Sequence, residues 1–131
     1  MILIDTHIWI WWVSNSPLLK KEYRSLLENA NKGTVHISII SCWEVAKAVE
    51  TGKLKFNISV DSWLKQAIDN YAVNIIPLDM DIIVDSTRLS GSFHKDPADQ
   101  IIVATARCRD YQLITQDRKI LEYPHVKLLK I

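Results

Sequence analysis

Residues 93–105 read Phe93-His94-Lys95-Asp96-Pro97-Ala98-Asp99-Gln100-Ile101-Ile102-Val103-Ala104-Thr105. Asp96 suits the N-cap of a helix, Pro97 its first position and Asp99 its third, and apolar residues follow at helical spacing. Both carboxylates would lie at the positive end of the helix dipole. A helix start therefore explains this stretch by itself, but three other isolated acids lie at or just beyond the ends of apolar, strand-like runs: Asp5, Glu44 and Asp117.

Length and composition predict one globular domain over residues 1–131. Hydrophobic residues make up 48% and charged residues 24%, which is typical of a folded protein and not of a disordered one. The net charge of +1 gives no overall basic excess that would indicate nucleic acid, although a local patch can still bind it. The apolar segment Met1–Val13 contains Asp5, lacks a basic leader and is too short to span a bilayer. We therefore expect neither a signal peptide nor a membrane helix, and a cytoplasmic location.

The cysteines and histidines indicate no structural metal site or disulfide. Cys42 and Cys108 are far apart in the sequence and are predicted to be buried thiols in a reducing compartment. The four histidines are scattered without the spacing of zinc ligands.

Short apolar runs alternate with helical patterns along the whole chain. Strands are predicted at Met1–Ile4, Val35–Ile40, Val73–Ile76, Tyr111–Thr115 and Val126–Leu129. Helices are predicted at Thr6–Val13, Pro17–Ala30, Ser41–Val49, from Ser59 or Asp61 to Tyr71, from Asp79 or Asp81 to Leu89, at Pro97–Asp110 and at Arg118–Leu121. This alternation predicts an α/β fold in which a parallel sheet is covered by helices on both faces.

The isolated acids can converge at one edge of such a sheet. Ligands of open parallel sheets bind beyond the carboxyl ends of the strands. A group of carboxylates there would repel one another unless a cation compensates, and hard oxygen ligands suit Mg²⁺ or Mn²⁺. Such a site can activate a water and stabilise the departing oxygen of a phosphodiester. The alternatives remain open: Glu44 can complete a capping box with Ser41, and Asp117 can cap the helix at Arg118–Leu121.

Four segments, taken in order, resemble the PIN-domain ribonucleases, and most closely the VapC-like toxins of type II toxin–antitoxin pairs. They are Leu3-Ile4-Asp5-Thr6-His7, Ser41-Cys42-Trp43-Glu44-Val45-Ala46-Lys47, His94-Lys95-Asp96-Pro97-Ala98-Asp99 and Thr115-Gln116-Asp117-Arg118. The resemblance spans nearly the whole chain. It implies a three-layer α/β/α fold with a central parallel sheet of about five strands.

The resemblance also assigns roles to individual residues. The acidic core is Asp5, Glu44, Asp96 and Asp99, with Asp117 at a later and more variable acidic position; together they would hold one or two Mg²⁺ ions. Thr6 and Thr115 match the threonines of the family. Gln100 is a departure, because close relatives often carry Arg after the second Asp of the motif. We expect contacts with the RNA backbone from Thr6, His94, Lys95, Arg118 and Lys119.

Partners follow from the same resemblance: a homodimer, and an antitoxin whose tail occupies the active-site groove. Trp9, Trp11 and Trp12 follow Asp5 closely, and we expect at least one of them to line a groove for that antitoxin.

Two other functions remain open. A phosphoacceptor domain would also place acids at strand ends but needs a pair of acids after the first strand, where Asp5 stands alone. A non-catalytic binding domain would be expected to have lost some of these acids.

Overall fold

A computed structural model describes residues 1–131 and contains a sheet of four parallel strands. The strands are β1 (Ile2–Ile4), β2 (Val35–Ser38), β3 (Asn74–Ile76) and β4 (Gln112–Ile114). Their order across the sheet is β3-β2-β1-β4, so that β1 is central and pairs with β2 on one side and β4 on the other. The carboxyl ends of all four strands therefore lie along one edge.

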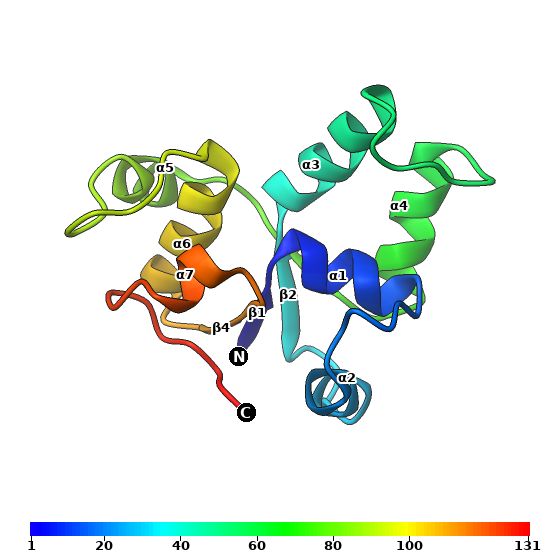
Figure 1. Cartoon of the computed structure of the whole chain (residues 1–131), viewed down its shortest axis with the longest axis horizontal. Helices are drawn as coiled ribbons and strands as arrows, with labels where there is room; N and C mark the ends of the chain where they lie inside the picture. Colours follow the sequence, from blue (N-terminus) through cyan, green and yellow to red (C-terminus); the bar gives the residue numbers. More distant parts are fainter.

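Seven helices cover the sheet on both faces (Figure 1). They are α1 (Thr6–Val13), α2 (Lys21–Glu28), α3 (Ile39–Glu50), α4 (Val60–Asp69), α5 (Met80–Ser86), α6 (Pro97–Arg109) and α7 (Arg118–Leu121). Figure 1 shows α1 to α4 on one side of the strands and α5 to α7 on the other. The predicted three-layer α/β/α architecture is confirmed. No helix combines the length and apolar character needed to cross a membrane.

The two layers enclose separate cores because successive strand residues face opposite sides of the sheet. Ile2 and Ile4 of β1 lie in the core beneath α1 to α4, whereas Leu3 between them lies in the core beneath α5 to α7. All three side chains are buried, which explains the uninterrupted apolar run before Asp5.

The predicted fifth strand, Val126–Leu129, is reduced to a single bridge. Leu128 pairs with Leu113, and only two backbone hydrogen bonds join this segment to β4, from Leu113 to Lys127 and from Leu129 to Leu113. The sheet consequently has four strands, and the C-terminal segment only borders its β4 edge.

Two predicted helix starts are wrong, each because of a serine. Helix α2 begins at Lys21 and not at Pro17, because the Ser16 hydroxyl accepts a hydrogen bond from the Leu18 N–H and forms a separate turn. Helix α3 begins at Ile39, because Ser38 and not Ser41 is its N-cap and accepts a hydrogen bond from the Ile40 N–H. Glu44 is therefore not the third residue of the helix, and the capping-box interpretation fails.

The cysteines differ from the prediction in burial only. Both are free thiols, and no disulfide forms. Cys42 is half-buried on α3, whereas Cys108 is exposed on α6.

Candidate active site

Three of the predicted acids begin helices at the carboxyl edge of the sheet. Asp5 caps α1 and accepts the Ile8 N–H at 2.9 Å, and Asp96 caps α6 and accepts the Asp99 N–H at 3.0 Å. Asp117 caps α7 and accepts the Lys119 N–H at 2.8 Å. Each acid thus satisfies a free backbone donor, and the three helix N-termini add positive potential at this edge. The helix caps and the predicted site acids are therefore the same residues.

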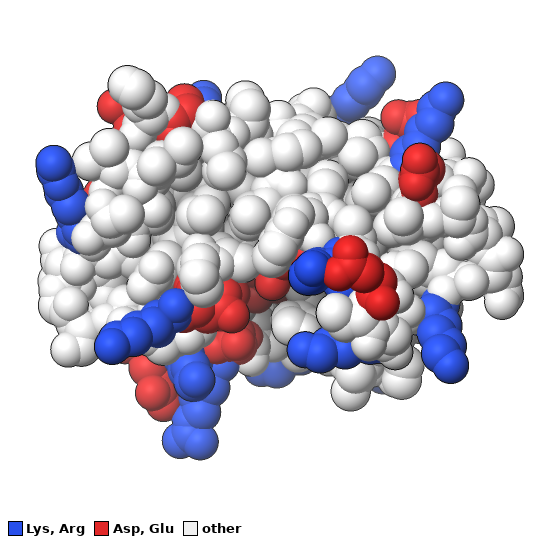
Figure 2. Space-filling model, turned by 90° about the horizontal axis from the view of Figure 1, so that it is seen from above, with Lys and Arg blue, Asp and Glu red and all other residues white.

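A pocket of about 650 Å³ at this edge gathers four of the five predicted acids. It is lined by His7, Glu44, His94, Lys95, Asp96, Asp99, Asp117, Arg118 and Lys119, none of them apolar. Figure 2 looks onto the molecule from this side and shows acidic side chains gathered together with Lys and Arg side chains around them. Residues from four separate parts of the chain therefore form one charged, water-accessible hollow.

Asp5, the fifth acid, lies behind the pocket and is 3% exposed. Its Oδ2 accepts a hydrogen bond from the Thr115 hydroxyl at the end of β4. Burial raises the pKa of Asp5 from 3.8 to about 6, against the opposing effects of Thr115 and the Ile8 N–H. Near neutral pH, Asp5 is thus an ionised carboxylate that the fold has deprived of water.

Glu44 projects from α3 and is held by Thr6 of α1. The Thr6 hydroxyl donates to Glu44 Oε1 and lies 2.8 Å from the Ser41 Oγ. Thr6 is buried and its hydroxyl is engaged with these two side chains, so it orients a carboxylate; its predicted contact with RNA stays a prediction. Burial raises the pKa of Glu44, and the charges of Asp96 and Asp5 raise it further.

Asp99, like Asp5, has a strongly raised pKa, and its carboxylate lies in the pocket itself. Burial is the first cause that raises the pKa of Asp99 to about 6. The negative charges of Asp96, Asp117 and Glu44 act in the same direction. His94 acts in the opposite direction and lowers the pKa of Asp99. Its Nε2 lies 3.0 Å from Asp99 Oδ2. This buried nitrogen makes no hydrogen bond of ordinary geometry, so the contact is electrostatic.

The donor set of the pocket suits a hard divalent cation. It offers carboxylate oxygens that raise one another's pKa, and no Lys or Arg forms an ion pair with any of these carboxylates. His94 offsets only part of this repulsion, and a bound cation would relieve the rest. No three His, Cys, Asp or Glu side chains already converge on one point as a finished metal cage. The residues fit such an ion by their chemistry.

The predicted phosphate contacts differ in accessibility. Lys95, Arg118 and Lys119 are exposed at the rim of the pocket, where they can reach a polyanion. Arg118 also forms an ion pair with Glu122 at 3.0 Å, in which both side chains are largely exposed, so the pairing is easily exchanged for a phosphate. His94 is half-buried beside Asp99 and is better placed to hold that carboxylate.

Only one of the three predicted partner-binding tryptophans is accessible beside the acids. Trp9 is fully buried and packs edge-on against Trp63 at 5.3 Å, and Trp12 packs edge-on against Tyr71 at 5.0 Å with 7% of its surface exposed. Burial removes Trp9 from any partner surface, and the small exposed part of Trp12 lines a different pocket from that of the acids. Trp11 is half-buried and lines two pockets beside the acids.

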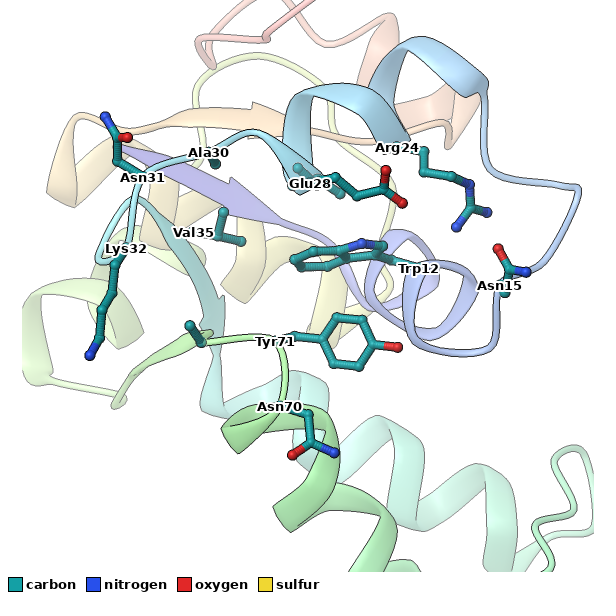
Figure 3. A pocket seen from close by; sticks show the side chains of 12 residues that line it. Trp12, Asn15, Arg24, Glu28, Ala30, Asn31, Lys32, Val35, Asn70 and Tyr71 are labelled. Atoms are coloured by element: carbon teal, nitrogen blue, oxygen red, sulfur yellow. The ribbon is translucent and has the colours of Figure 1, made fainter.

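A separate pocket of about 390 Å³ lies at the opposite, amino-terminal edge of the sheet. Figure 3 shows Trp12 and Tyr71 side by side in it, with Arg24 and Glu28 of α2 nearby. It contains none of the predicted acids, and Arg24 already donates to the Ser16 carbonyl at 2.7 Å. The acidic pocket is therefore the candidate active site.

Sequence reasoning assigned no role to three residues that shape the site. His7 lines the acidic pocket, and its charge lowers the pKa of Asp5 and of Glu44. Its position in the first turn after the Asp5 cap was the available signal. Gln116 accepts the Lys20 N–H and donates to the Leu18 carbonyl, which fastens the 16–20 turn beside Asp117. Gln100, the departure from the family, donates to the His94 carbonyl at 3.1 Å and steadies the loop before α6.

Comparisons with known proteins confirm the predicted resemblance. Ribonuclease VapC22 of Mycobacterium tuberculosis is 29% identical over 124 residues, which cover 95% of this chain and 92% of that protein. A toxin–antitoxin complex from Klebsiella pneumoniae contains a chain with a TM-score of 0.70 and 24% identity, with 99% of this chain and 97% of that chain covered. VapBC2 from Rickettsia felis, bound to a DNA fragment from its promoter, gives a TM-score of 0.71 and 22% identity, with 98% of each chain covered. The sequence model of the PIN domain matches residues 2–126, and the chain belongs to the PIN domain family.

Proposed function

We propose that this chain is a cytoplasmic, divalent-metal-dependent endoribonuclease, one PIN domain over residues 1–131, and the toxin of a type II toxin–antitoxin pair. The observation that carries the proposal is the pocket in which Glu44, Asp96, Asp99 and Asp117 meet without a Lys or Arg ion-pair partner. Similarity to a protein named as a ribonuclease supports RNA as the substrate.

Asp5, Glu44, Asp96 and Asp99 are the proposed catalytic residues, and together with Asp117 they are the proposed metal ligands. A bound Mg²⁺ or Mn²⁺ would neutralise these carboxylates and stabilise negative charge that develops on the phosphodiester. Thr115 and Thr6 hold Asp5 and Glu44 in fixed orientations through their hydroxyls. These hydrogen bonds favour the ionised carboxylates, the form in which oxygen atoms bind a cation.

Substrate binding is assigned to the rim of the pocket. Lys95 precedes the α6 cap, and Arg118 and Lys119 form the first turn of α7, so cations flank the acids on two elements. Contacts of this kind fix the position of a nucleic-acid backbone without sequence information. They also balance the negative charge of the pocket, which would otherwise repel RNA.

A phosphoacceptor function is less consistent with the site. The carboxylate that follows the central strand is Asp5, which is 3% exposed and whose two oxygens accept the Thr115 hydroxyl and the Ile8 N–H. A phosphoryl group bonded to either oxygen would need room that this burial does not leave, whereas a metal ion needs only a remaining lone pair on an oxygen.

Two protein partners complete the proposal. An antitoxin segment would cover the acidic pocket and contact Trp11, the accessible tryptophan of α1. The likeness to a chain from a toxin–antitoxin complex supports an antitoxin as the partner. A second copy of the chain would pack on α5, where Met80, Ile83 and Val84 are 76%, 47% and 41% exposed at helical spacing.

The test is cleavage of total RNA by purified, partner-free protein with Mg²⁺ or Mn²⁺, followed by sequencing of the new RNA ends. Cleavage at defined sites that EDTA abolishes is expected. Activity indifferent to EDTA would refute the metal-dependent mechanism. Stable labelling by a small-molecule phosphodonor without RNA cleavage would favour the phosphoacceptor function.

A further inference from the structure

A second pocket, of about 560 Å³, adjoins the acidic one and has a different character. Its lining is half aromatic and aliphatic, half polar: Thr6, His7, Ile10, Trp11, Trp43, Glu44, Lys47, Ala48, Thr51, Lys53 and Leu54. His7 and Glu44 line both pockets, so the two hollows adjoin at these residues. We refer to this second hollow, between α1 and the C-terminal half of α3, as the Trp43 pocket.

Trp43 has no structural explanation. Its side chain is 56% exposed, it belongs to neither hydrophobic core, and it pairs with no other aromatic ring. It precedes Glu44 on α3, so the same helix turn presents an acid to both pockets and an indole to the Trp43 pocket alone. On the facing helix α1, Trp11 is half-buried and its ring lies 5.6 Å from that of His7.

Two lysines give the pocket its charge. Lys47 lies one turn after Trp43 on α3 and is ion-paired with Glu50 at 2.6 Å, with half of its side chain exposed. Lys53 follows Gly52, whose φ of +80° ends the helix and folds the chain back. The Lys53 and Leu54 N–H groups then donate to the Ala48 carbonyl, at 2.8 and 3.1 Å, which fixes this return against α3. Glu44 is the only acid in the lining.

We infer that the Trp43 pocket is a base-binding subsite for single-stranded RNA, in which an unpaired base next to the cleaved phosphodiester stacks on Trp43. An exposed indole face is a surface on which an unpaired base can stack, and neighbouring lysines can bind the backbone phosphates. A base that is paired in a duplex cannot enter such a pocket, so the subsite selects single-stranded loops and ends. This inference rests on the proposed ribonuclease function and adds the residue that holds a base beside the cleaved bond.

Trp43→Ala is the direct test, measured on binding of a single-stranded oligoribonucleotide in EDTA and on cleavage with Mg²⁺ or Mn²⁺. Loss of one base–aromatic stack is expected to raise Kd and KM about 5-fold to 150-fold. Trp43→Phe should keep most of the affinity because it keeps a stacking face, whereas Trp43→Leu, which keeps only apolar volume, should not. Lys53→Ala should weaken binding and lower its salt dependence, with Lys65→Ala on the exposed side of α4 as the matched control.

An abasic scan separates stacking from a general effect on the fold. One abasic site at a time is placed along the oligonucleotide, and each is measured with wild type and with Trp43→Ala. At a single position next to the cleaved bond, the abasic change should weaken RNA binding by wild type by the same factor as Trp43→Ala does. At that position it should not weaken RNA binding by the Trp43→Ala variant any further. Uniform sensitivity at every position, or none, would overturn the inference.

The outcomes distinguish this inference from the proposed function. Cleavage that is the same in wild type and Trp43→Ala for every oligonucleotide refutes the subsite and leaves the ribonuclease standing. Trp43-dependent binding of single-stranded RNA without cleavage under any metal refutes the ribonuclease and leaves the subsite. Unchanged RNA binding with weakened antitoxin binding in Trp43→Ala would make the pocket a protein-docking site and would also overturn the inference.

Discussion

The Thr115 hydroxyl donates a hydrogen bond to Asp5 Oδ2 across 110 residues of sequence. The same oxygen of Thr115 accepts the Asp117 N–H at 3.0 Å, so one side chain at the end of β4 ties together acids at the starts of α1 and α7. The hydrogen bond lowers the pKa of Asp5 and partly offsets the effect of burial. Parallel pairing of β1 with β4 brings the two residues together.

Thr115→Val should therefore raise the pKa of Asp5 above about 6. We expect the acid limb of the pH profile of RNA cleavage to move to higher pH, because Asp5 is ionised over a narrower range. Thr115→Ser keeps the hydroxyl and should restore the wild-type profile. A lower rate with an unshifted pH profile would show that Thr115 acts only through packing.

The raised pKa of Asp5 also predicts how stability depends on pH without metal. The folded value of about 6 lies above the ordinary value of 3.8, so the folded protein retains a proton that the unfolded chain has released. The contribution of Asp5 to the free energy of unfolding falls as pH rises from about 4 to about 6, and its full penalty is present above about pH 6. A shift of about two units corresponds to about 3 kcal/mol.

Urea denaturation of wild type and Asp5→Asn in EDTA, at about pH 5 and about pH 7.5, measures this penalty. The substitution should raise stability more at the higher pH. Mg²⁺ should stabilise wild type and have much less effect on the variant. An equal effect of the substitution at both pH values would mean that the Asp5 pKa is not raised.

Much of this arrangement could be predicted from local sequence, since caps and strand ends carry local signals. Asp96-Pro97 and Asp117-Arg118 mark helix starts at the observed residues, and the apolar run before Asp5 marks a doubly buried strand. The start of α3 could not be predicted this way, because Ile39 and Ile40 favour a strand and only the Ser38 hydrogen bond decides for a helix. Trp9 and Trp12 lie on the face of α1 that packs in the core, whereas Trp11 only borders it. The crowded aromatic run gives no periodicity from which that face could be predicted.

Trp11→Ala is expected to weaken antitoxin binding by about 1 kcal/mol or more if its ring is an anchor. The fold should persist, because Trp11 only borders the core that Trp9 and Trp12 fill. Binding can be measured by titration of the purified antitoxin, with Trp11→Phe as a variant that keeps an aromatic ring. Unchanged affinity would remove α1 from the partner surface.

Ile83→Glu should convert a homodimer into a monomer, because it places a charge in the middle of the exposed apolar stripe on α5. Light scattering of the purified variant measures the mass. Ile58→Glu, at a similar exposure of 43% against 47% for Ile83, is the control and should leave the mass unchanged. A wild-type protein that is monomeric at all concentrations would contradict the assignment of this surface.

Asp96→Asn tests the central claim most directly, namely that the acids at the helix starts form a metal-dependent RNA-cleaving site. Asn caps a helix about as well as Asp, so α6 should keep its stability to within about 0.5 kcal/mol. RNA cleavage with Mg²⁺ or Mn²⁺ should fall by orders of magnitude. Asp79→Asn makes the same change at the cap of α5, outside the pocket, and should keep wild-type activity. An Asp96→Asn protein that cleaves RNA at the wild-type rate would contradict the account.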